Sequence, residues 1–138
     1  IVFRKTDNRF TEDEATVQLE HVLSDDTIRM VNRNAGSGTR ALIDDLLGDQ
    51  QPPGFALQVR SHNAVAAAVA QERADWGIGI AHVAEMYGLG FQPIQPEQFD
   101  LVIPASRDHR PAVRALRKLL GDSDVRLQLS AMGCTIAD

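Results

Sequence analysis

Cysteine and aromatic residues are scarce in this sequence of 138 residues, and long apolar runs are missing from it. The single cysteine, Cys134, excludes a disulfide within the chain and a cysteine-rich zinc site, so we expect no metal. Every apolar run is shorter than the roughly 18 residues that a membrane-spanning helix needs, so we expect no contact with a membrane. Residues 1–5 already include the charged pair Arg4 and Lys5 and do not resemble an export signal, which favours the cytoplasm over the periplasm.

Basic residues are also fewer than acidic residues in this sequence. The chain has 14 Lys and Arg against 19 Asp and Glu, and this net charge of −5 argues against a nucleic-acid-binding surface. The arginines nevertheless stand next to the most distinctive loops, because Arg33 and Arg40 bracket one and Arg60 precedes the other. An acidic protein can bind an anion where the local charge is positive, so we expect a small anion as the partner.

Short apolar segments alternate with helical patterns along the chain, which predicts an α/β fold with a mixed sheet flanked by helices, organised as one domain over residues 1–138. Strands are expected at 28–31, 56–59, 77–80 and 101–103. Helices are expected within 7–26, at 39–47, 64–71 and 81–87, from 111 and from 123. In the helix from Pro111, the residues expected to face inward are Val113, Leu116, Leu119 and Leu120.

The loop Gly36-Ser37-Gly38-Thr39-Arg40 follows one expected strand and opens a helix. Backbone N–H groups in the first turn of a helix lack partners within the helix, and the helix dipole makes that end partly positive. Glycines allow close approach of a ligand, hydroxyls add donors and an arginine adds charge, which together favour an anion site. The alternative is that Ser37 or Thr39 only caps the helix and the glycines only shape a turn.

A second loop of this kind, Ser61-His62-Asn63, also lies between an expected strand and a helix. Ligands of doubly wound sheets bind beyond the carboxyl ends of strands, so two such loops can converge on one site. Here too, Ser61 or Asn63 as a plain helix cap is the alternative.

Motifs of nucleotide binding and of catalysis are missing. The first loop lacks the Gly-Lys-Ser/Thr ending of a phosphate-binding loop, and it does not match GxGxxG. No HExxH or GxSxG occurs, and none of the four histidines pairs with another at the spacing of a helical metal site. We therefore expect a binding protein that is not itself an enzyme and that has no cofactor beyond a bound oxoanion.

Four motifs occur in a recognisable order over residues 29–104: VNRNAGSGTR at 31–40, SHNAVAAAVA at 61–70, ADWGIGI at 74–80 and FDLVIP at 99–104. In these the sequence resembles the periplasmic-binding-protein-like domain associated with molybdate handling. Such domains occur fused behind MoeA-type molybdopterin biosynthesis enzymes or behind winged-helix regulators of the molybdate type.

The resemblance implies a type II binding-protein fold, in which two lobes close on the ligand. It implies a molybdate- or tungstate-like oxoanion, in molybdenum cofactor biosynthesis or regulation, and a fused or neighbouring domain as partner. Ligand contacts are expected from both loops: Gly36, Ser37, Gly38, Thr39, Arg40, Ser61, His62 and Asn63. Residues before Arg29 match poorly, so the domain is expected to be incomplete, as one lobe plus part of the other. The alternative is the effector-binding domain of a transcription regulator, or an ABC-transporter receptor, that recognises a small organic acid.

We also expect particular structural roles for individual residues near the third motif. Similar sequences have glycine where this one has Glu72, so we expect backbone strain at that helix end. Asp75 is expected to accept hydrogen bonds from nearby backbone N–H groups, and Trp76 is expected in the core. The ending Gly133-Cys134-Thr135 departs from the family pattern, which puts a ligand role of that region in doubt.

Overall fold

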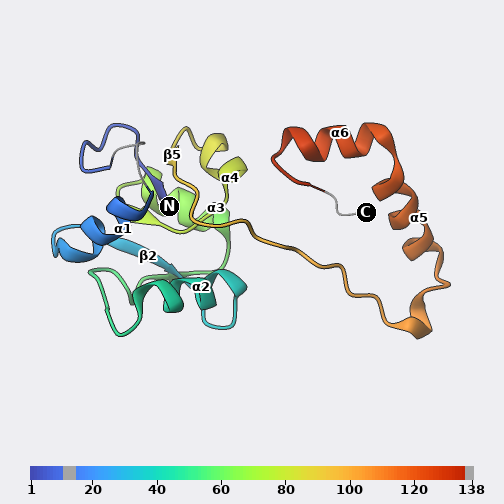
Figure 1. The fold of residues 1–138 in the computed structure, drawn as a ribbon, viewed down its shortest axis with the longest axis horizontal. Helices are drawn as coiled ribbons and strands as arrows, with labels where there is room; N and C mark the ends of the chain where they lie inside the picture. Colours follow the sequence, from blue (N-terminus) through green and yellow to red (C-terminus); the bar gives the residue numbers. More distant parts are fainter. Residues whose placement is uncertain (11–14, 136–138) are drawn as a thin grey trace. The chain divides into compact units, whose positions relative to one another are not determined.

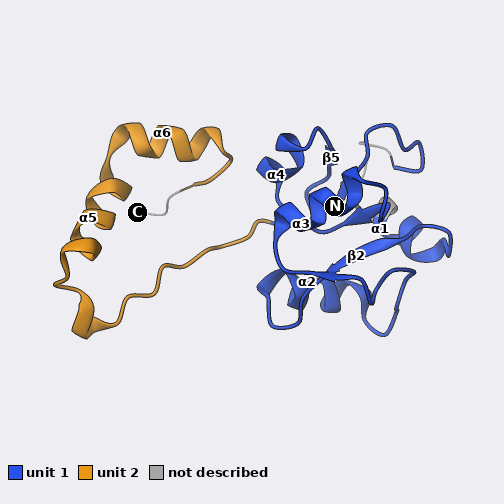
Figure 2. Cartoon of the chain, turned by 180° about the vertical axis from the view of Figure 1, so that it is seen from behind, with its two compact units in different colours: residues 1–95 blue, residues 96–138 orange. Residues whose placement is uncertain are grey.

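The structure is a computed structural model of the chain, and it describes residues 1–10 and 15–135 (Figure 1). The chain divides into two compact units, Ile1–Gln95 and Pro96–Asp138 (Figure 2). The first unit contains the sheet and the buried core, and the second contains two helices.

A five-stranded mixed sheet forms the centre of the first unit, with the order β3-β2-β4-β1-β5. Its strands are β1 (Val2–Phe3), β2 (Met30–Arg33), β3 (Gln58–Val59), β4 (Trp76–Gly77) and β5 (Gly90–Phe91). Strand β2 is parallel to β3 and β4, whereas β1 is antiparallel to β4 and β5. The expected α/β class with a mixed sheet is therefore confirmed.

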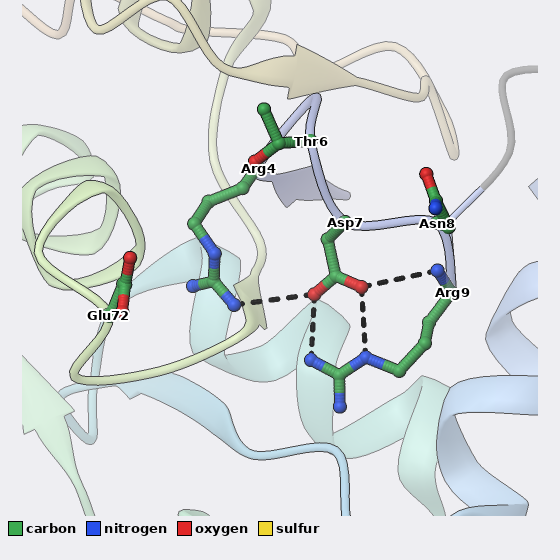
Figure 3. A pocket seen from close by; sticks show the side chains of 6 residues that line it. All are labelled: Arg4, Thr6, Asp7, Asn8, Arg9 and Glu72. Carbon is green, nitrogen blue, oxygen red and sulfur yellow. Dashed lines mark hydrogen bonds and ion pairs between the residues drawn. The ribbon is translucent and has the colours of Figure 1, made fainter.

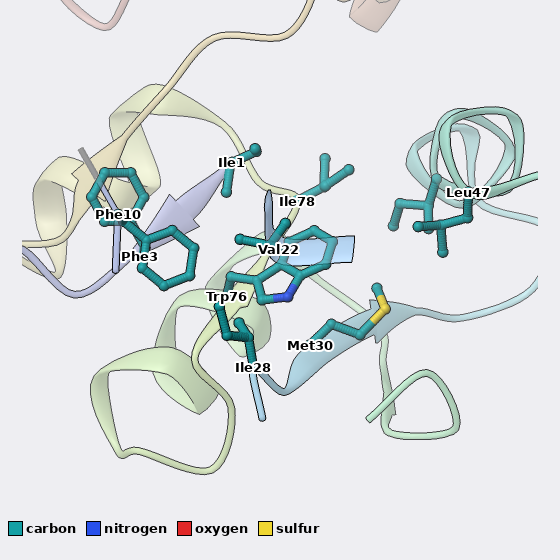
Figure 4. Packing of buried hydrophobic residues seen from close by; sticks show 10 residues of the cluster. Ile1, Phe3, Phe10, Val22, Ile28, Met30, Leu47, Trp76 and Ile78 are labelled. Atoms are coloured by element: carbon teal, nitrogen blue, oxygen red, sulfur yellow. The ribbon is translucent and has the colours of Figure 1, made fainter. Parts of the chain in front are cut away.

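Helices cover both faces of this sheet. Successive side chains of a strand point to opposite faces, so each face presents apolar side chains to the helices packed on it. The helices of this unit are α1 (Ala15–Ser24), α2 (Gly38–Leu47), α3 (His62–Ala70) and α4 (Ala81–Met86). One face carries the core around Trp76 and Met30, which packs against α1 and α2 through Val22, Ile43 and Leu47 (Figure 4). Trp76 is fully buried there, as expected from the sequence.

The other face packs closely against α3. Val31 of β2 joins Val65, Ala66, Ala68 and Val69 of α3 in a second buried cluster. A Cβ atom added at Gly77 would lie only 2.7 Å from Val65 Cγ1 and 2.8 Å from Val31 Cγ1. The small residues of α3 and the glycine of β4 therefore allow helix and sheet to approach closely.

Helix positions agree better with the sequence than strand positions do. The helices expected at 39–47, 64–71 and 81–87 are α2, α3 and α4, and α1 lies within the expected segment 7–26, of which residues 11–14 are outside the described part. The strands expected at 28–31 and 77–80 are instead Met30–Arg33 and Trp76–Gly77. Such short ladders are set by which neighbouring strand supplies the hydrogen bonds, and not by apolar runs alone.

The second unit contains a 3₁₀ turn (Ala105–Arg107) and the helices α5 (Pro111–Gly121) and α6 (Ser123–Ala131). The strand expected at 101–103 was wrong: these residues have no pairing partner among the described residues, and Val102 is 88% exposed. The helix from Pro111 is confirmed, but the expectation that its apolar residues face inward is wrong for Leu119, which is 53% exposed. Val113, Leu116 and Leu120 are only half-buried. None of the helices in the described part of the chain has the length and apolarity to cross a membrane.

Candidate functional site

The beginnings of α2 and α3 lie at the same edge of the sheet. Strands β2 and β3 are parallel neighbours, with Arg33 opposite Val59 at their carboxyl ends. The chain then turns into α2 at Gly38 and into α3 at His62. Because each helix follows its strand by a few residues, the first turns of the two helices are brought together.

Arg33 connects these two first turns. Its Nη1 lies 3.5 Å from Thr39 Oγ1 on α2 and 3.3 Å from both ring nitrogens of His62 on α3. A guanidinium group only donates, so one ring nitrogen of a neutral imidazole would have to be the acceptor in this contact. Two residues of the predicted site are thus brought together by a third residue that was not included in it.

The charge of Arg33 is buried without a compensating carboxylate. The residue is only 8% exposed, and among the described residues no Asp or Glu forms an ion pair with it. Its Nε is buried and has no hydrogen-bond partner. Buried charges are normally paired, because the loss of hydration must be offset by an opposite charge or by hydrogen bonds. A buried guanidinium group that lies between two helix beginnings and has no carboxylate partner among the described residues is therefore a feature that an anion would complete.

The loop before α2 supplies further donors. Ser37 caps the helix, because its Oγ accepts from Arg40 N at 3.2 Å, and it also donates to Asn34 O at 3.1 Å. Gly36 has φ 82°, a left-handed conformation that glycine adopts without strain. In the described part of the chain, the N–H groups of Gly38 and Thr39 have no acceptor. The alternative interpretation, in which Ser37 caps the helix, is therefore correct as far as it goes. The cap leaves the N–H groups of Gly38 and Thr39 unused.

The loop before α3 is capped in the same way. Ser61 Oγ accepts from Ala64 N at 3.1 Å, so Ser61 caps the helix, as the alternative interpretation of this loop predicts. Ser61 and Asn63 are exposed, whereas His62 is half-buried against Arg33. Of this loop, His62 is the residue that contacts the rest of the candidate site.

Arg40 is occupied within the fold. Its Nε donates to Asp44 Oδ1 at 2.7 Å, its Nη1 donates to Arg33 O at 3.2 Å, and its guanidinium carbon lies 4.9 Å from the centre of the Phe55 ring. We expected Arg40 to supply the charge of the site, but its charge is already paired with Asp44. Arg33 is the better-placed cation. The signal in the sequence was an arginine at the end of an apolar strand, directly before the glycine-rich loop.

A hollow of about 470 Å³ lies elsewhere in the first unit (Figure 3). Its lining residues are Arg4, Thr6, Asp7, Asn8, Arg9 and Glu72. The two arginines are paired with carboxylates: Arg9 Nη2 lies 2.7 Å from Asp7 and 2.8 Å from Asp75, and Arg4 Nη2 lies 2.7 Å from Asp75. This network ties the segment after β1 to the start of β4, so we interpret it as structural.

Both carboxylates of this network are held in the charged form. The hydrogen bond from the Arg9 side chain lowers the pKa of Asp7. Burial acts to raise the pKa of Asp75, but hydrogen bonds from Arg29 N, Arg4 and Arg9 outweigh it, so that the pKa is lowered. Asp75 Oδ2 accepts from one backbone N–H group, that of Arg29, at 2.8 Å, and Asp75 Oδ1 accepts from the side chains of Arg4 and Arg9, which were not expected as partners.

Residues that commonly bind metals do not gather in the described part. Within residues 1–10 and 15–135, no group of three or more His, Cys, Asp or Glu side chains is placed to hold a metal ion. Cys134 is exposed and has a free thiol.

Helix beginnings at the carboxyl ends of parallel strands are where open α/β sheets bind their ligands, and the candidate site is of this class. Residues 11–121 match the PBP superfamily domain, and the chain belongs to that superfamily. Proteins of known sequence that are similar to it include the uncharacterized protein YvgK of Bacillus subtilis (strain 168), 34% identical over 108 residues, which are 75% of this chain and 34% of that protein. Another is an uncharacterized protein encoded in the 5′ region of a ferredoxin 2Fe-2S gene of Clostridium pasteurianum, 28% identical over 81 residues, which are 58% of this chain and 72% of that protein.

The chain thus spans about a third of the length of the Bacillus subtilis relative. No solved structure matches the chain.

Proposed function

We propose that the chain binds a small anion between the first turns of α2 and α3, and that it is not itself an enzyme. The observation that carries this proposal is Arg33, a buried cation without a carboxylate partner among the described residues. Membership of the PBP superfamily supports a ligand-binding role. The N–H groups of Gly38 and Thr39 are donors of the kind that bind anions at helix beginnings.

The ligand that we propose is a molybdate- or tungstate-like oxoanion, in molybdenum cofactor biosynthesis or regulation. This finer proposal rests on the four sequence motifs that resemble molybdate-associated domains. We also propose the two-lobed, type II arrangement on this basis, with part of the cleft supplied by residues outside this chain, and a cytoplasmic protein with a fused or neighbouring partner domain.

A small organic acid is the second candidate, because a planar guanidinium group such as that of Arg33 also matches a carboxylate in a bidentate manner. The protein would then be the effector-binding domain of a transcription regulator or the receptor of an ABC transporter. A calorimetric titration with molybdate, tungstate, sulfate and succinate separates the two candidates. Heat with succinate alone would contradict the oxoanion, and no heat with any of the four would contradict the anion site.

The role of Arg33 is tested by Arg33→Gln, with Arg60→Gln as the matched control. Arg60 is an exposed arginine directly before Ser61, so its removal changes the net charge equally but leaves the buried cation in place. We expect Arg33→Gln to abolish binding and Arg60→Gln to weaken it by no more than about threefold, as for an exposed charge.

Thermal stability gives a second readout of the same variant. Removing a buried charge that has no carboxylate partner among the described residues is expected to leave the free protein as stable as the wild type or more stable. At a ligand concentration of about 100 times Kd, the wild type gains about 2.7 kcal/mol, whereas the variant gains nothing. An equal gain in both proteins would remove Arg33 from the site.

A further inference from the structure

The last residue of β2, Arg33, lies beyond the strand that pairs with β2 on one side. Strand β4 pairs with only the first two residues of β2. The N–H groups of Asn32 and Asn34 donate to carbonyl groups on the β3 side, at 2.8 and 3.0 Å. Because main-chain groups alternate from side to side along a strand, the N–H and C=O of Arg33 face the side where β4 has already ended.

Two side chains take the place of the missing strand there. Asn32 Oδ1 accepts from Arg33 N at 2.8 Å. Arg40 Nη1 donates to Arg33 O at 3.2 Å. Buried main-chain groups need such partners, and these two side chains hold the peptide groups on both sides of the Arg33 side chain.

Phe55 connects the two side chains that hold Arg33. Asn32 Nδ2 donates to Phe55 O at 3.2 Å. The Phe55 ring lies 4.9 Å from the guanidinium carbon of Arg40, which is a cation–π contact. The Nε of the same guanidinium group donates to Asp44 Oδ1 at 2.7 Å. Arg33, Asn32, Phe55 and Arg40 thus form a closed ring of contacts.

The position of Phe55 is itself fixed by the sheet and the core. A Cβ atom added at Gly54 would overlap Met30 O, so the loop before Phe55 runs directly along β2. The N–H of Phe55 donates to Pro52 O at 3.0 Å, and its side chain is half-buried against the core cluster that contains Trp76. The ring of contacts is therefore anchored in the well-packed part of the first unit.

We propose that Arg40 and Phe55 are positioning residues of the candidate anion site, which hold the main chain of Arg33 so that its guanidinium group lies between α2 and α3. This proposal rests on the proposed function. Arg40 then acts on the anion through Arg33 and not through its own charge, which is paired with Asp44. A charged group binds its ligand well only where its surroundings hold it in the productive position.

The test is a calorimetric titration with tungstate and with sulfate of the wild type, Arg40→Gln, Phe55→Leu and the double variant. We expect each single variant to bind both anions about tenfold more weakly, as for residues that orient a ligating side chain. We expect the double variant to bind within about threefold of the weaker single variant, because both changes remove the same contact.

Two further variants separate positioning from general packing. Phe55→Tyr keeps the aromatic ring beside Arg40, so we expect it to bind within about threefold of the wild type. Phe91→Leu is the matched control, because Phe91 is also half-buried in the first unit but packs against the other buried cluster, and we expect it to bind as the wild type does. All titrations are made at a temperature where thermal denaturation shows each variant to be fully folded.

The outcomes separate this proposal from the proposed function. Wild-type affinity of Phe55→Leu, or losses that multiply in the double variant, would show that Arg40 acts independently of Phe55 and would overturn the positioning role. An equal loss in Phe91→Leu, or no rescue by Phe55→Tyr, would attribute the effect to packing and would overturn it as well. Absence of binding of both anions by the wild type would contradict the proposed function, and the positioning role with it.

Discussion

Arg33 and Asp75 are both charged side chains within the first unit, and their surroundings differ. Asp75 faces two arginines and a backbone N–H group, so its charge is fully compensated. Arg33 faces a histidine and a threonine and has no carboxylate partner among the described residues. A compensated charge stabilises the fold, whereas an uncompensated one costs stability unless a ligand completes it.

Asp75→Asn tests the structural network. The change keeps the shape of the side chain but removes the charge that Arg4 and Arg9 face, and we expect a loss of about 2 kcal/mol in the free energy of unfolding at pH 7. Urea denaturation measures it. Asp44→Asn is the control, because Asp44 pairs with Arg40 while its side chain is 51% exposed, and we expect a loss of about 0.5 kcal/mol or less.

The same variant is expected to change the pH dependence of stability. The pKa of Asp75 is lowered in the folded protein, so its contribution is fully present above the unfolded value of about 3.9 and is lost as the pH falls through the folded value. Between neutral pH and the acid transition, the stability of Asp75→Asn should therefore fall less than that of the wild type. Parallel curves for the two proteins would contradict this account of the network.

At the scale of elements, the C-terminus of α3 shows backbone strain that the sequence predicted. The N–H of Arg73 donates to Ala68 O at 2.9 Å and that of Glu72 to Val69 O at 3.1 Å, which are the two bonds of a Schellman motif. This motif needs a left-handed residue at the position of Glu72, whose φ is 59°. The expected strain at Glu72 is thus confirmed.

Replacing this residue with glycine is expected to stabilise the protein. Glu72→Gly removes a left-handed strain of about 1–2 kcal/mol, part of which is offset by the greater freedom of glycine in the unfolded chain, so we expect a net gain of about 0.5–1 kcal/mol. Thermal denaturation measures it. Glu72→Ala removes the same carboxylate but keeps a Cβ atom, and it should give no gain. An equal gain from alanine would attribute the effect to charge and not to the backbone.

The sequence predicted helices more reliably than strands for a physical reason. Helix α2 has an apolar stripe and a serine cap within a few residues of one another, so the information is local. Strands β3, β4 and β5 have only two residues each, and β5 was not predicted at all. The apolar residues 101–103 would need a neighbouring strand, which the described residues do not provide.

At the scale of the whole molecule, the sequence could predict that the two loops lie at one edge of the sheet, but it could not predict that Arg33 lies between them. The order of strand, glycine-rich loop and helix indicated which end of the sheet to examine, and the parallel pairing of β2 and β3 brings both loops to that end. Which arginine lies between them depends on the alternation of side chains along β2 and on how Phe55 and Asp44 hold Arg40. The contact of Arg33 with His62 joins segments that are distant in sequence, so no local pattern predicts it.

The two units differ in how far their side chains are buried. The buried hydrophobic residues all belong to the first unit, and within residues 96–135 no residue is buried. The first unit therefore contains both the core and the candidate site, and the positions of Arg33, Thr39 and His62 depend on that core.

The most direct test of the anion site is a crystal structure of the protein with tungstate, located by the anomalous scattering of tungsten. We predict one tungstate whose oxygens lie within hydrogen-bonding distance of the Arg33 guanidinium group and of the N–H groups of Gly38 and Thr39. The same crystals of Arg33→Gln should show no tungsten there. Tungstate bound instead beside Arg4 and Arg9, or an unchanged tungsten peak in the variant, would contradict the account.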